Sequence, residues 1–479
     1  MYKEKQKKQI GKESAHDDVN TKESDILNNS TRRFVSGSKP SVNARRAAYE
    51  TLLGIEQNAK FSNIAVSETI VKYSISGRER DLYTKLVYGT VEKAITLDYI
   101  IQQYISKRLK TLDKSVLIIL RLSVYQIMFC EKIPESAAVD EGVKLAKRYA
   151  SRATGFINAV LRRVCAKDIL MPHKDDFVKF LSVLYSVDES ICRLFVEQYG
   201  NEKAENILKG FDNIPRICLN VNISRGQKRD EFIESSGYDM SLCRYSTTGV
   251  ILNSGMSLSD SECIADGSAF VQGEASQLAV SALEPRPDMS VIDVCASPGG
   301  KSFAAANIMR SKGHILSLDV HSNKLSLISE GAERLGYNII SVAQHDGRFP
   351  ISELSGTADR VICDVPCSGF GVMAKKPELR YKKAESADGL PDIQYEILKS
   401  SSSYLKRGGI MVYSTCTINR KENENVVKRF IHENSGYSLM DFSFKDTQGP
   451  DLLNSSEGML TLLPENGTDG FFIARIVKN

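Results

Sequence analysis

The chain has 479 residues, of which 42% are hydrophobic and 25% are charged, and its formal net charge is +4. This composition is typical of a globular protein and excludes a mainly disordered or collagen-like chain. No window approaches the ~20 consecutive apolar residues that a membrane-spanning helix needs, and no apolar stretch follows the lysine-rich start to make a signal peptide. We therefore expect a cytoplasmic protein that does not enter a membrane.

Ten cysteines and six histidines are spread along the chain without a C-x-x-C pair or a histidine cluster. Because zinc sites need closely spaced thiolate and imidazole ligands, we expect no metal. Most thiols in such a chain are small buried apolar groups. Only cysteines in a chemical context are candidates for reaction.

The first part of the chain is predicted to be a tail followed by helices. Residues 1–40 are rich in Lys, Ser, Asn and Asp and predict a disordered tail. From residue 41 apolar side chains such as Ala44, Ala47 and Ala48 recur at helical spacing. The same spacing occurs at 97–105, 115–129, 138–149 and 155–164. We predict one all-helical domain over 41–167.

Positive charge is concentrated in this helical segment. Residues 107–167 contain 13 Lys and Arg against five Asp and Glu. Residues 142–167 contain no acid and seven bases, namely Lys144, Lys147, Arg148, Arg152, Arg162, Arg163 and Lys167. Such an excess favours a phosphate backbone as partner, although a solvated helix face gives the same pattern.

Residues 168–267 have a different pattern. Short apolar runs at 216–222 and 249–253 predict strands on either side of a helix at 229–235. We predict a small mixed α+β module that links two larger domains.

The remaining chain, 268–479, alternates between strands and helices. Strands are predicted at 291–295, 314–320, 338–343, 360–364 and 410–414, and helices at 301–309 and 393–405. Such βαβ alternation predicts a parallel sheet with helices on both faces. Ligands bind sheets of this kind beyond the carboxyl ends of the strands.

A glycine turn follows the first of these strands, where 293–301 read Asp-Val-Cys-Ala-Ser-Pro-Gly-Gly-Lys. Consecutive glycines before a helix let a ligand approach exposed backbone amides. Asp319 ends the second strand about 20 residues later, where a carboxylate can accept hydrogen bonds from a ribose diol. Asp346 follows the third strand, within reach of an adenine amino group. A P-loop would need glycine at Cys295, and the G-x-G-x-x-G fingerprint is absent, so S-adenosylmethionine is favoured over a nucleotide or a tight turn without a ligand.

Two cysteines follow the fourth and fifth strands. Cys367 comes three residues after Asp364, and Cys416 lies in the sequence Tyr-Ser-Thr-Cys-Thr. Strands one, four and five are neighbours in a doubly wound sheet, so both thiols are predicted to share a crevice with the glycine turn. One such cysteine is usually part of the core, but two beside an aspartate favour nucleophilic catalysis. Methylation of cytosine at C5 needs a thiolate, because C5 is a poor nucleophile until a thiolate adds to C6.

These segments closely resemble the motifs of RNA 5-methylcytosine methyltransferases. The resemblance rests on 293–301, 364–371 and 414–417, and extends to 271–272, 274–277, 406–409, 463–464 and 469–472. Residues 41–167 resemble a NusB-type RNA-binding domain, whose last helix is matched by 158–163. The combination is similar to the Sun/Fmu (RsmB) family, which methylates one cytosine of 16S ribosomal RNA.

The resemblance implies three folded parts after the tail. These are an all-α NusB-like domain over 41–167, a small α+β linker domain over 168–267, and an α/β Rossmann-like S-adenosylmethionine-dependent methyltransferase domain over 268–479. The implied partner is 16S rRNA, naked or in early assembly, bound by a monomer without a metal. Two alternatives stay open: methylation of tRNA or of a different rRNA site, and a NusB-type RNA-binding protein without catalysis.

The family's roles carry over to matching positions. Cys416 is the implied nucleophile, Cys367 assists product release, and Asp364 borders the cofactor and bonds the cytosine edge. The implied cofactor-binding residues are Cys295, Ala296, Ser297, Pro298, Gly299, Gly300, Lys301, Asp319, Asp346 and Asp364. Two positions depart from the family, because Gly273 and Glu378 each stand where it has aspartate.

Overall fold

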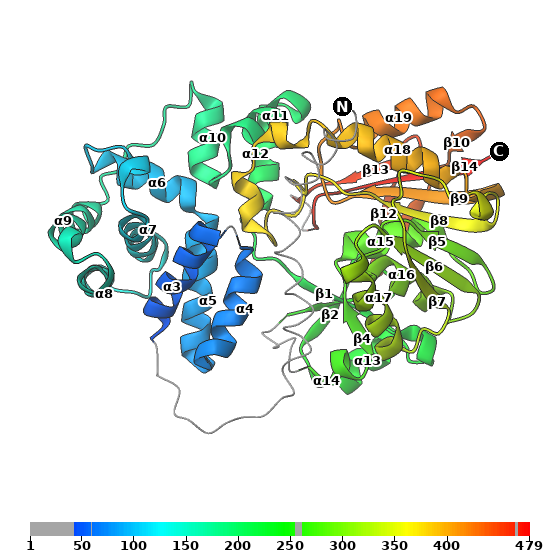
Figure 1. Cartoon of the computed structure of the whole chain (residues 1–479), viewed down its shortest axis with the longest axis horizontal. Helices are drawn as coiled ribbons and strands as arrows, with labels where there is room; N and C mark the ends of the chain where they lie inside the picture. Colours follow the sequence, from blue (N-terminus) through cyan, green and yellow to red (C-terminus); the bar gives the residue numbers. More distant parts are fainter. Residues whose placement is uncertain (1–42, 59, 254–260, 465–467) are drawn as a thin grey trace, which may run out of the picture. The chain divides into compact units, whose positions relative to one another are not determined.

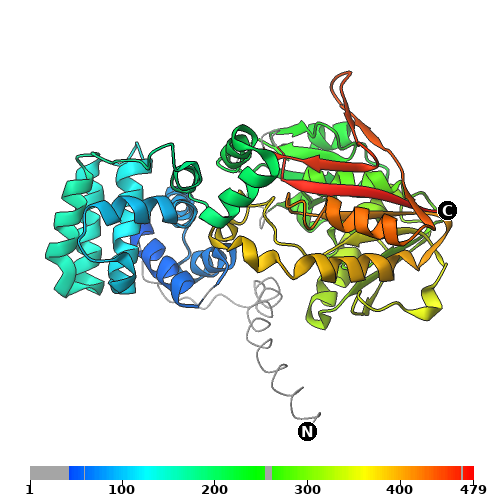
Figure 2. The same ribbon diagram turned by 90° about the horizontal axis from the view of Figure 1, so that it is seen from above.

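The computed structural model describes residues 43–479 except 59, 254–260 and 465–467, and the predicted tail over 1–40 lies outside this described part. The chain folds into two compact units, which are drawn in Figures 1 and 2. The helical unit comprises Met1–Arg193 and Lys376–Lys382. The sheet unit comprises Leu194–Lys375 and Lys383–Asn479. None of the described helices is long and apolar enough to cross a membrane.

The helical unit is built around α7 (Lys114–Phe129). Asp113 caps this helix by accepting the amide of Ser115 at 2.8 Å, a common role of aspartate. Residues around its whole circumference are buried, including Leu120, as expected of a helix that is apolar on all sides. The helices that surround it are α3 (Ala44–Asn58), α4 (Ser62–Tyr73), α5 (Gly77–Glu92), α6 (Ala94–Gln103), α8 (Glu135–Tyr149), α9 (Thr154–Val164) and α10 (Phe177–Tyr185). The predicted all-α architecture of this part is confirmed.

A short segment from much later in the sequence completes the helical unit. Lys376–Lys382 contains the 3₁₀ helix η7 (Pro377–Tyr381). Its Arg380 is fully buried, and Nη1 donates to the carbonyl of Tyr185 at 2.7 Å. The carbonyl of Arg380 in turn accepts the amide of Asp188 at 2.8 Å. A buried guanidinium needs such partners, so this segment is an integral part of the unit.

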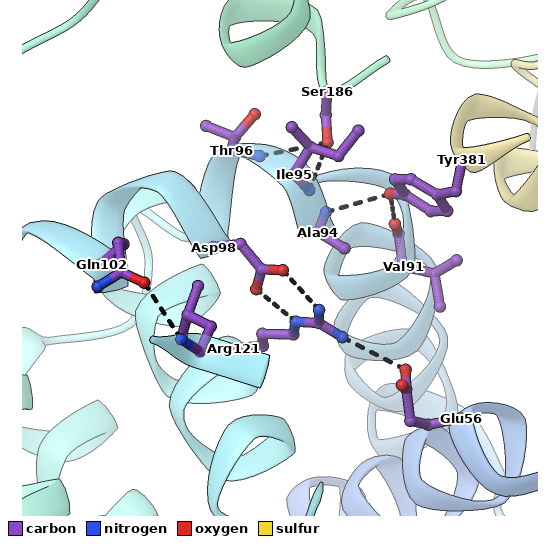
Figure 3. A network of polar contacts seen from close by, with 11 residues as sticks. Glu56, Val91, Ala94, Ile95, Thr96, Asp98, Gln102, Arg121, Ser186 and Tyr381 are labelled. Carbon is purple, nitrogen blue, oxygen red and sulfur yellow. Dashed lines mark hydrogen bonds and ion pairs between the residues drawn. The ribbon is translucent and has the colours of Figure 1, made fainter. Parts of the chain in front are cut away.

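Tyr381 and Glu378 extend this packing. The hydroxyl of Tyr381 accepts the amide of Ala94 at 3.1 Å and donates to the carbonyl of Val91, so it joins the end of α5 to the start of α6 (Figure 3). Burial raises the pKa of Tyr381 to about 12, and the hydroxyl therefore keeps its proton. The carboxylate of Glu378 accepts the amide of Ser62 at the start of α4, where a negative charge is favourable. This departure from the family is thus a helix cap supplied from a distant segment.

The sheet unit contains a small antiparallel sheet in the order β2-β3-β1-β4. Its strands are β1 (Ile217–Val221), β2 (Met240–Leu242), β3 (Gly249–Leu252) and β4 (Ala269–Val271). Phe232 of α13 (Arg229–Ser236) packs with Leu219 and Val250 in a separate small core. Because this sheet shares one compact unit with the larger sheet, the boundaries at 167/168 and 267/268 stay predictions.

The larger sheet has the order β10-β14-β9-β8-β5-β6-β7, and β13 also pairs with β14. Its strands are β5 (Ser290–Asp293), β6 (His314–Asp319), β7 (Ile340–Gln344), β8 (Ala358–Asp364), β9 (Leu405–Thr415), β10 (Tyr437–Leu439), β13 (Met459–Leu462) and β14 (Phe471–Lys478). Strands β5 to β9 are parallel, whereas β14 runs antiparallel to all its neighbours. The Rossmann-like α/β fold is confirmed. The prediction of a wholly parallel sheet is wrong at this edge, because β13 and β14 form an antiparallel pair that adds to the side of β9.

Helices cover both faces of the larger sheet (Figure 1). They are α15 (Glu274–Leu283), α16 (Gly300–Ile308) and α17 (Ser322–Leu335) on one face, and α18 (Leu390–Ser402) and α19 (Glu424–Glu433) on the other. Phe303 of α16 belongs to one buried core, and Phe430 of α19 to the other. Strand β8 lies between β5 and β9, as predicted, so the carboxyl ends of these three strands meet.

Candidate active site

A cavity of about 450 Å³ lies at the carboxyl ends of the parallel strands. Seven of the predicted site residues line it: Cys295, Ser297, Asp319, Asp346, Asp364, Cys367 and Cys416. The other five, which are not part of its wall, are Ala296, Pro298, Gly299, Gly300 and Lys301. In the part of the chain that the structure describes, no cluster of three or more His, Cys, Asp or Glu side chains could hold a metal ion.

The glycine turn between β5 and α16 is tightly closed. The amide of Gly299 donates to the carbonyl of Ala296 at 2.7 Å. Gly299 has φ 106°, and a Cβ there would lie 2.4 Å from the ring of Phe303, so only glycine fits. The carbonyl of Gly300 accepts the side-chain amide of Gln272 at 2.8 Å. The chain therefore enters α16 in one fixed conformation.

Asp319 connects this turn to the end of β6. Its Oδ2 accepts the amide of Ser297 at 3.0 Å, and its Oδ1 accepts the amide of His321 at 2.9 Å. The residue is 7% exposed. Each carboxylate oxygen has a second lone pair, so Asp319 can accept further hydrogen bonds from the cavity.

Asp346 has a guanidinium partner. Arg348 Nε lies 3.0 Å from Oδ1 and Nη2 lies 2.6 Å from Oδ2. Hydrogen bonds from Arg348 hold the pKa of Asp346 below its usual range. The carboxylate that the sequence suggested for adenine is therefore already held at the cavity wall by a neighbouring side chain.

Asp364 is held from two sides. Lys301 Nζ donates to its Oδ2, and the Ser414 hydroxyl donates to its Oδ1, both at 2.6 Å. The Lys301 amine also lies 5.5 Å from the ring centre of Phe471. Sequence reasoning grouped Lys301 with the cofactor turn, but its amine pairs with the acid beside the thiols.

The two cysteines after β8 and β9 lie side by side. Their sulfurs are 3.3 Å apart and both are free thiols, since a disulfide would bring them to ~2.05 Å. The contact with Cys416, together with burial, raises the pKa of Cys367 well above its ordinary value. Burial likewise raises the pKa of Cys295.

Gly273 makes room for an ion pair. Lys375 Nζ and Asp469 Oδ2 are 2.6 Å apart. A Cβ on Gly273 would lie 2.9 Å from that Oδ2 and 3.1 Å from that Nζ. Glycine at 273 therefore leaves room for the ion pair between Lys375 and Asp469, which an aspartate side chain at 273 would disturb.

Sequence reasoning missed a set of buried polar side chains behind the cysteines. Glu422, Gln394 and Thr417 are fully buried. Glu422 accepts the amide of Ser368 at 2.8 Å. The signal in the sequence is the mainly polar run over 417–423, which lies between β9 and α19.

Comparison with known proteins extends these observations. Residues 280–477 match the family described as 16S rRNA methyltransferase RsmB/F, and residues 42–166 match the NusB family. A Bacillus subtilis (strain 168) protein named "Probable ribosomal RNA small subunit methyltransferase B" is 36% identical, over 91% of this chain and 99% of its own. A Synechocystis protein of the same name is 31% identical, over 91% and 100%. The solved structure of PH0851 has a TM-score of 0.76 at 23% identity, and covers 92% of this chain and 100% of its own.

The fold and the site define an rRNA methyltransferase in which a NusB-like helical domain precedes a Rossmann-like domain. Two relatives above 30% identity match it over nearly their whole length. The chain belongs to the RsmB/F family of 16S rRNA methyltransferases.

Proposed function

We propose that the chain transfers a methyl group from S-adenosylmethionine to C5 of a cytosine in 16S rRNA, through a covalent bond between Cys416 and C6. One observation carries the choice of C5. Two thiols 3.3 Å apart share a cavity with Asp364 and Asp319. Methylation of an oxygen or nitrogen uses a lone pair that is already present, whereas C5 needs a thiolate to make it nucleophilic.

The residues around the cavity fit S-adenosylmethionine. The carboxylates of Asp319 and Asp346, after adjacent strands, suit ribose hydroxyls and an amino group. The cavity volume of about 450 Å³ is within the usual range for small-molecule sites. When bound, S-adenosylmethionine supplies an electrophilic methyl group.

The cofactor assignment has its own test. Asp319→Ala should weaken S-adenosylmethionine binding by about 1–3 kcal/mol, the range for a lost hydrogen bond to a charged group. Calorimetry measures this directly, with Asp392→Ala on the exposed face of α18 as the control. Unchanged affinity in Asp319→Ala would remove this carboxylate from the cofactor site.

The two thiols would act in sequence. The Cys416 thiolate forms a bond to C6, and the electron pair of the C5=C6 bond becomes available at C5 for the methyl group. C5 then loses its proton, the double bond forms again, and the bond from C6 to sulfur breaks. Cys367, whose sulfur lies 3.3 Å from that of Cys416, would assist this release of the product.

Asp364 would orient the base. Lys301 and Ser414 each occupy one of its oxygens, and the remaining lone pairs can accept the amino group of cytosine. Because both partners are donors, they hold the carboxylate in the acceptor role that this contact needs.

A basic surface on the helical unit suits the RNA backbone. Seven bases from α8 to the end of α9 are exposed, and two of them, Lys144 and Lys167, pair with Glu141 and Glu135. Among the described residues no acid forms an ion pair with the other five, which are Lys147, Arg148, Arg152, Arg162 and Arg163. Phe156, 38% exposed, lies on the same segment, and an exposed ring can stack on a base.

The overall proposal is tested on the RNA product. Bisulfite sequencing of 16S rRNA should reveal one 5-methylcytosine that is lost when the gene is deleted and restored by the wild-type chain but not by Cys416→Ser. A methyl group on another atom, or on tRNA alone, would contradict the proposal.

A further inference from the structure

A buried carboxylate lies behind the two cysteines. Glu422 follows β9 and has no exposed surface. Its Oε2 accepts the amide of Ser368 at 2.8 Å and the side-chain amide of Gln394 at 3.0 Å. Its Oε1 accepts the side-chain amide of Asn419 at 3.0 Å. All three partners are donors, so both oxygens act as acceptors, which is the role of an ionised carboxylate.

These contacts reach both cysteine-bearing turns. Ser368 is the residue after Cys367, and Asn419 lies three residues after Cys416. One carboxylate therefore connects the two turns through opposite oxygens. Removal of the Glu422 carboxylate would leave its three donors without an acceptor. Buried donors without an acceptor are rare in proteins because they are destabilising.

Further hydrogen bonds support the same arrangement. The hydroxyls of Ser368 and Thr417 are 2.8 Å apart. Gln394 Nε2 also donates to the carbonyl of Pro366 at 2.9 Å. The amide of Gly371 donates to the carbonyl of Cys416 at 3.0 Å. The sulfurs are thus held at 3.3 Å by a network that crosses between the turns.

Glu422 places a negative charge beside the turn of Cys367. Its Oε2 contacts the residue directly after Cys367. Together with Cys416, Glu422 is one of the groups that raise the pKa of Cys367. A nearby negative charge disfavours a thiolate, so Glu422 makes ionisation of Cys367 less favourable.

We infer that Glu422 is a positioning residue that assigns the roles of the two thiols. Its hydrogen bonds fix the two turns against each other, and its charge beside Cys367 leaves Cys416 as the sulfur that reacts. This rests on the proposed function for its meaning in catalysis. The unequal reactivity of the thiols, however, exists without RNA or cofactor.

The experiment is alkylation of the full-length protein with iodoacetamide at pH 7.5, with the labelled cysteine identified by peptide mass spectrometry. In the wild type Cys416 should label before Cys367. Glu422→Gln should shift the ratio toward Cys367 by roughly tenfold, the effect of one pKa unit. Glu396→Gln, the same change at an exposed position of α18, should leave the ratio unchanged.

Two further variants separate charge from structure. Gln394→Leu removes a neutral donor from the same carboxylate, so methylation should slow while Cys416 still labels first. Glu422→Asp keeps the charge, and Cys416 should again label first even if Glu422→Gln fails to fold. A folded Glu422→Gln with the wild-type ratio, or a reversed order in Glu422→Asp, would overturn the inference. If the wild-type protein labels first at Cys416 but forms no 5-methylcytosine in 16S rRNA, the result would count against the proposed function instead.

Discussion

The helical unit and the sheet unit bury polar groups in different ways. Around α7 the core is apolar, and a buried polar side chain such as Gln126 donates to a backbone carbonyl of its own helix at 3.0 Å. In the sheet unit, buried acids such as Asp293 and Glu422 gather behind the carboxyl ends of the strands. Among the described residues of the helical unit, Arg380 is a fully buried charged side chain, and it comes from the late segment Lys376–Lys382. Around α7, buried side chains therefore contribute mainly to stability. At the strand ends, buried charged side chains indicate a site of chemistry.

The largest effects are expected at the thiols. Cys416→Ser should abolish methylation and form no covalent RNA adduct, because a hydroxyl replaces the attacking thiolate. Cys367→Ser should stall with protein attached to RNA, visible as a slow, denaturation-resistant band on a gel. Both variants should unfold like the wild type, since serine is close in size to cysteine and both thiols line a cavity. An adduct with Cys416→Ser and none with Cys367→Ser would reverse the two roles.

The next effect concerns the apolar core of the helical unit. Leu120→Ala removes a fully buried side chain of α7 and should lower the free energy of unfolding by about 2–5 kcal/mol. Denaturant titration measures the loss. Leu170→Ala, at a position that is 74% exposed, should change it by less than ~0.5 kcal/mol. Equal losses of unfolding free energy in the two variants would mean that side chains buried around α7 stabilise the protein no more than exposed ones.

In the sheet unit, stability should depend on pH through Asp293. Burial raises the pKa of Asp293 to about 7, while an unfolded carboxyl titrates near ~3.9. Between those values the native state binds the extra proton, so its stability falls as pH rises, by up to about 1.4 kcal/mol per pH unit. Asp293→Asn removes this titration. Its free energy of unfolding relative to the wild type should therefore rise by roughly 1–3 kcal/mol as the pH increases from 5 to 7. The same gain at both pH values would mean that Asp293 does not titrate in this range.

The smallest effect is expected on the exposed surface of the helical unit. Arg162→Gln combined with Arg163→Gln should weaken rRNA binding without affecting the unfolding transition. Each lost phosphate contact should reduce the slope of log affinity against log salt by about 0.7. Lys445→Gln, an exposed change in the sheet unit, is the control. Slopes that stay equal would identify the basic run as a solvated face.

The site was predictable from the sequence because it depends on strand order. Asp364, Cys367 and Cys416 each follow a strand, and parallel neighbours bring such residues to one edge. The antiparallel β14 was not predictable in the same way. Its apolar run over 471–478 indicates a buried strand, but hydrophobicity carries no information about direction.

Long-range pairing was the other limit. The sequence around Lys301 predicts the start of a helix. It does not predict that the Lys301 amine donates to Asp364, which is 63 residues away. Glu422 is one acid in a polar run, and only the fold turns it inward to Ser368. The segment around Arg380 has the composition of a surface loop. In the fold, Arg380 is buried and donates to the carbonyl of Tyr185, which is 195 residues away. Such contacts depend on tertiary structure, which no local period encodes.

That late segment also sets an order of completion during synthesis. The ribosome makes residues up to Arg193 long before it reaches Lys376, the start of the segment that the helical unit needs. At elongation rates of ~5–20 residues per second, the delay over these 183 residues (376 minus 193) is roughly 10–40 s. During this interval the carbonyl of Tyr185 and the amide of Asp188 lack the Arg380 contacts that later satisfy them. The first unit to emerge is therefore finished only after about two thirds of the second has been made.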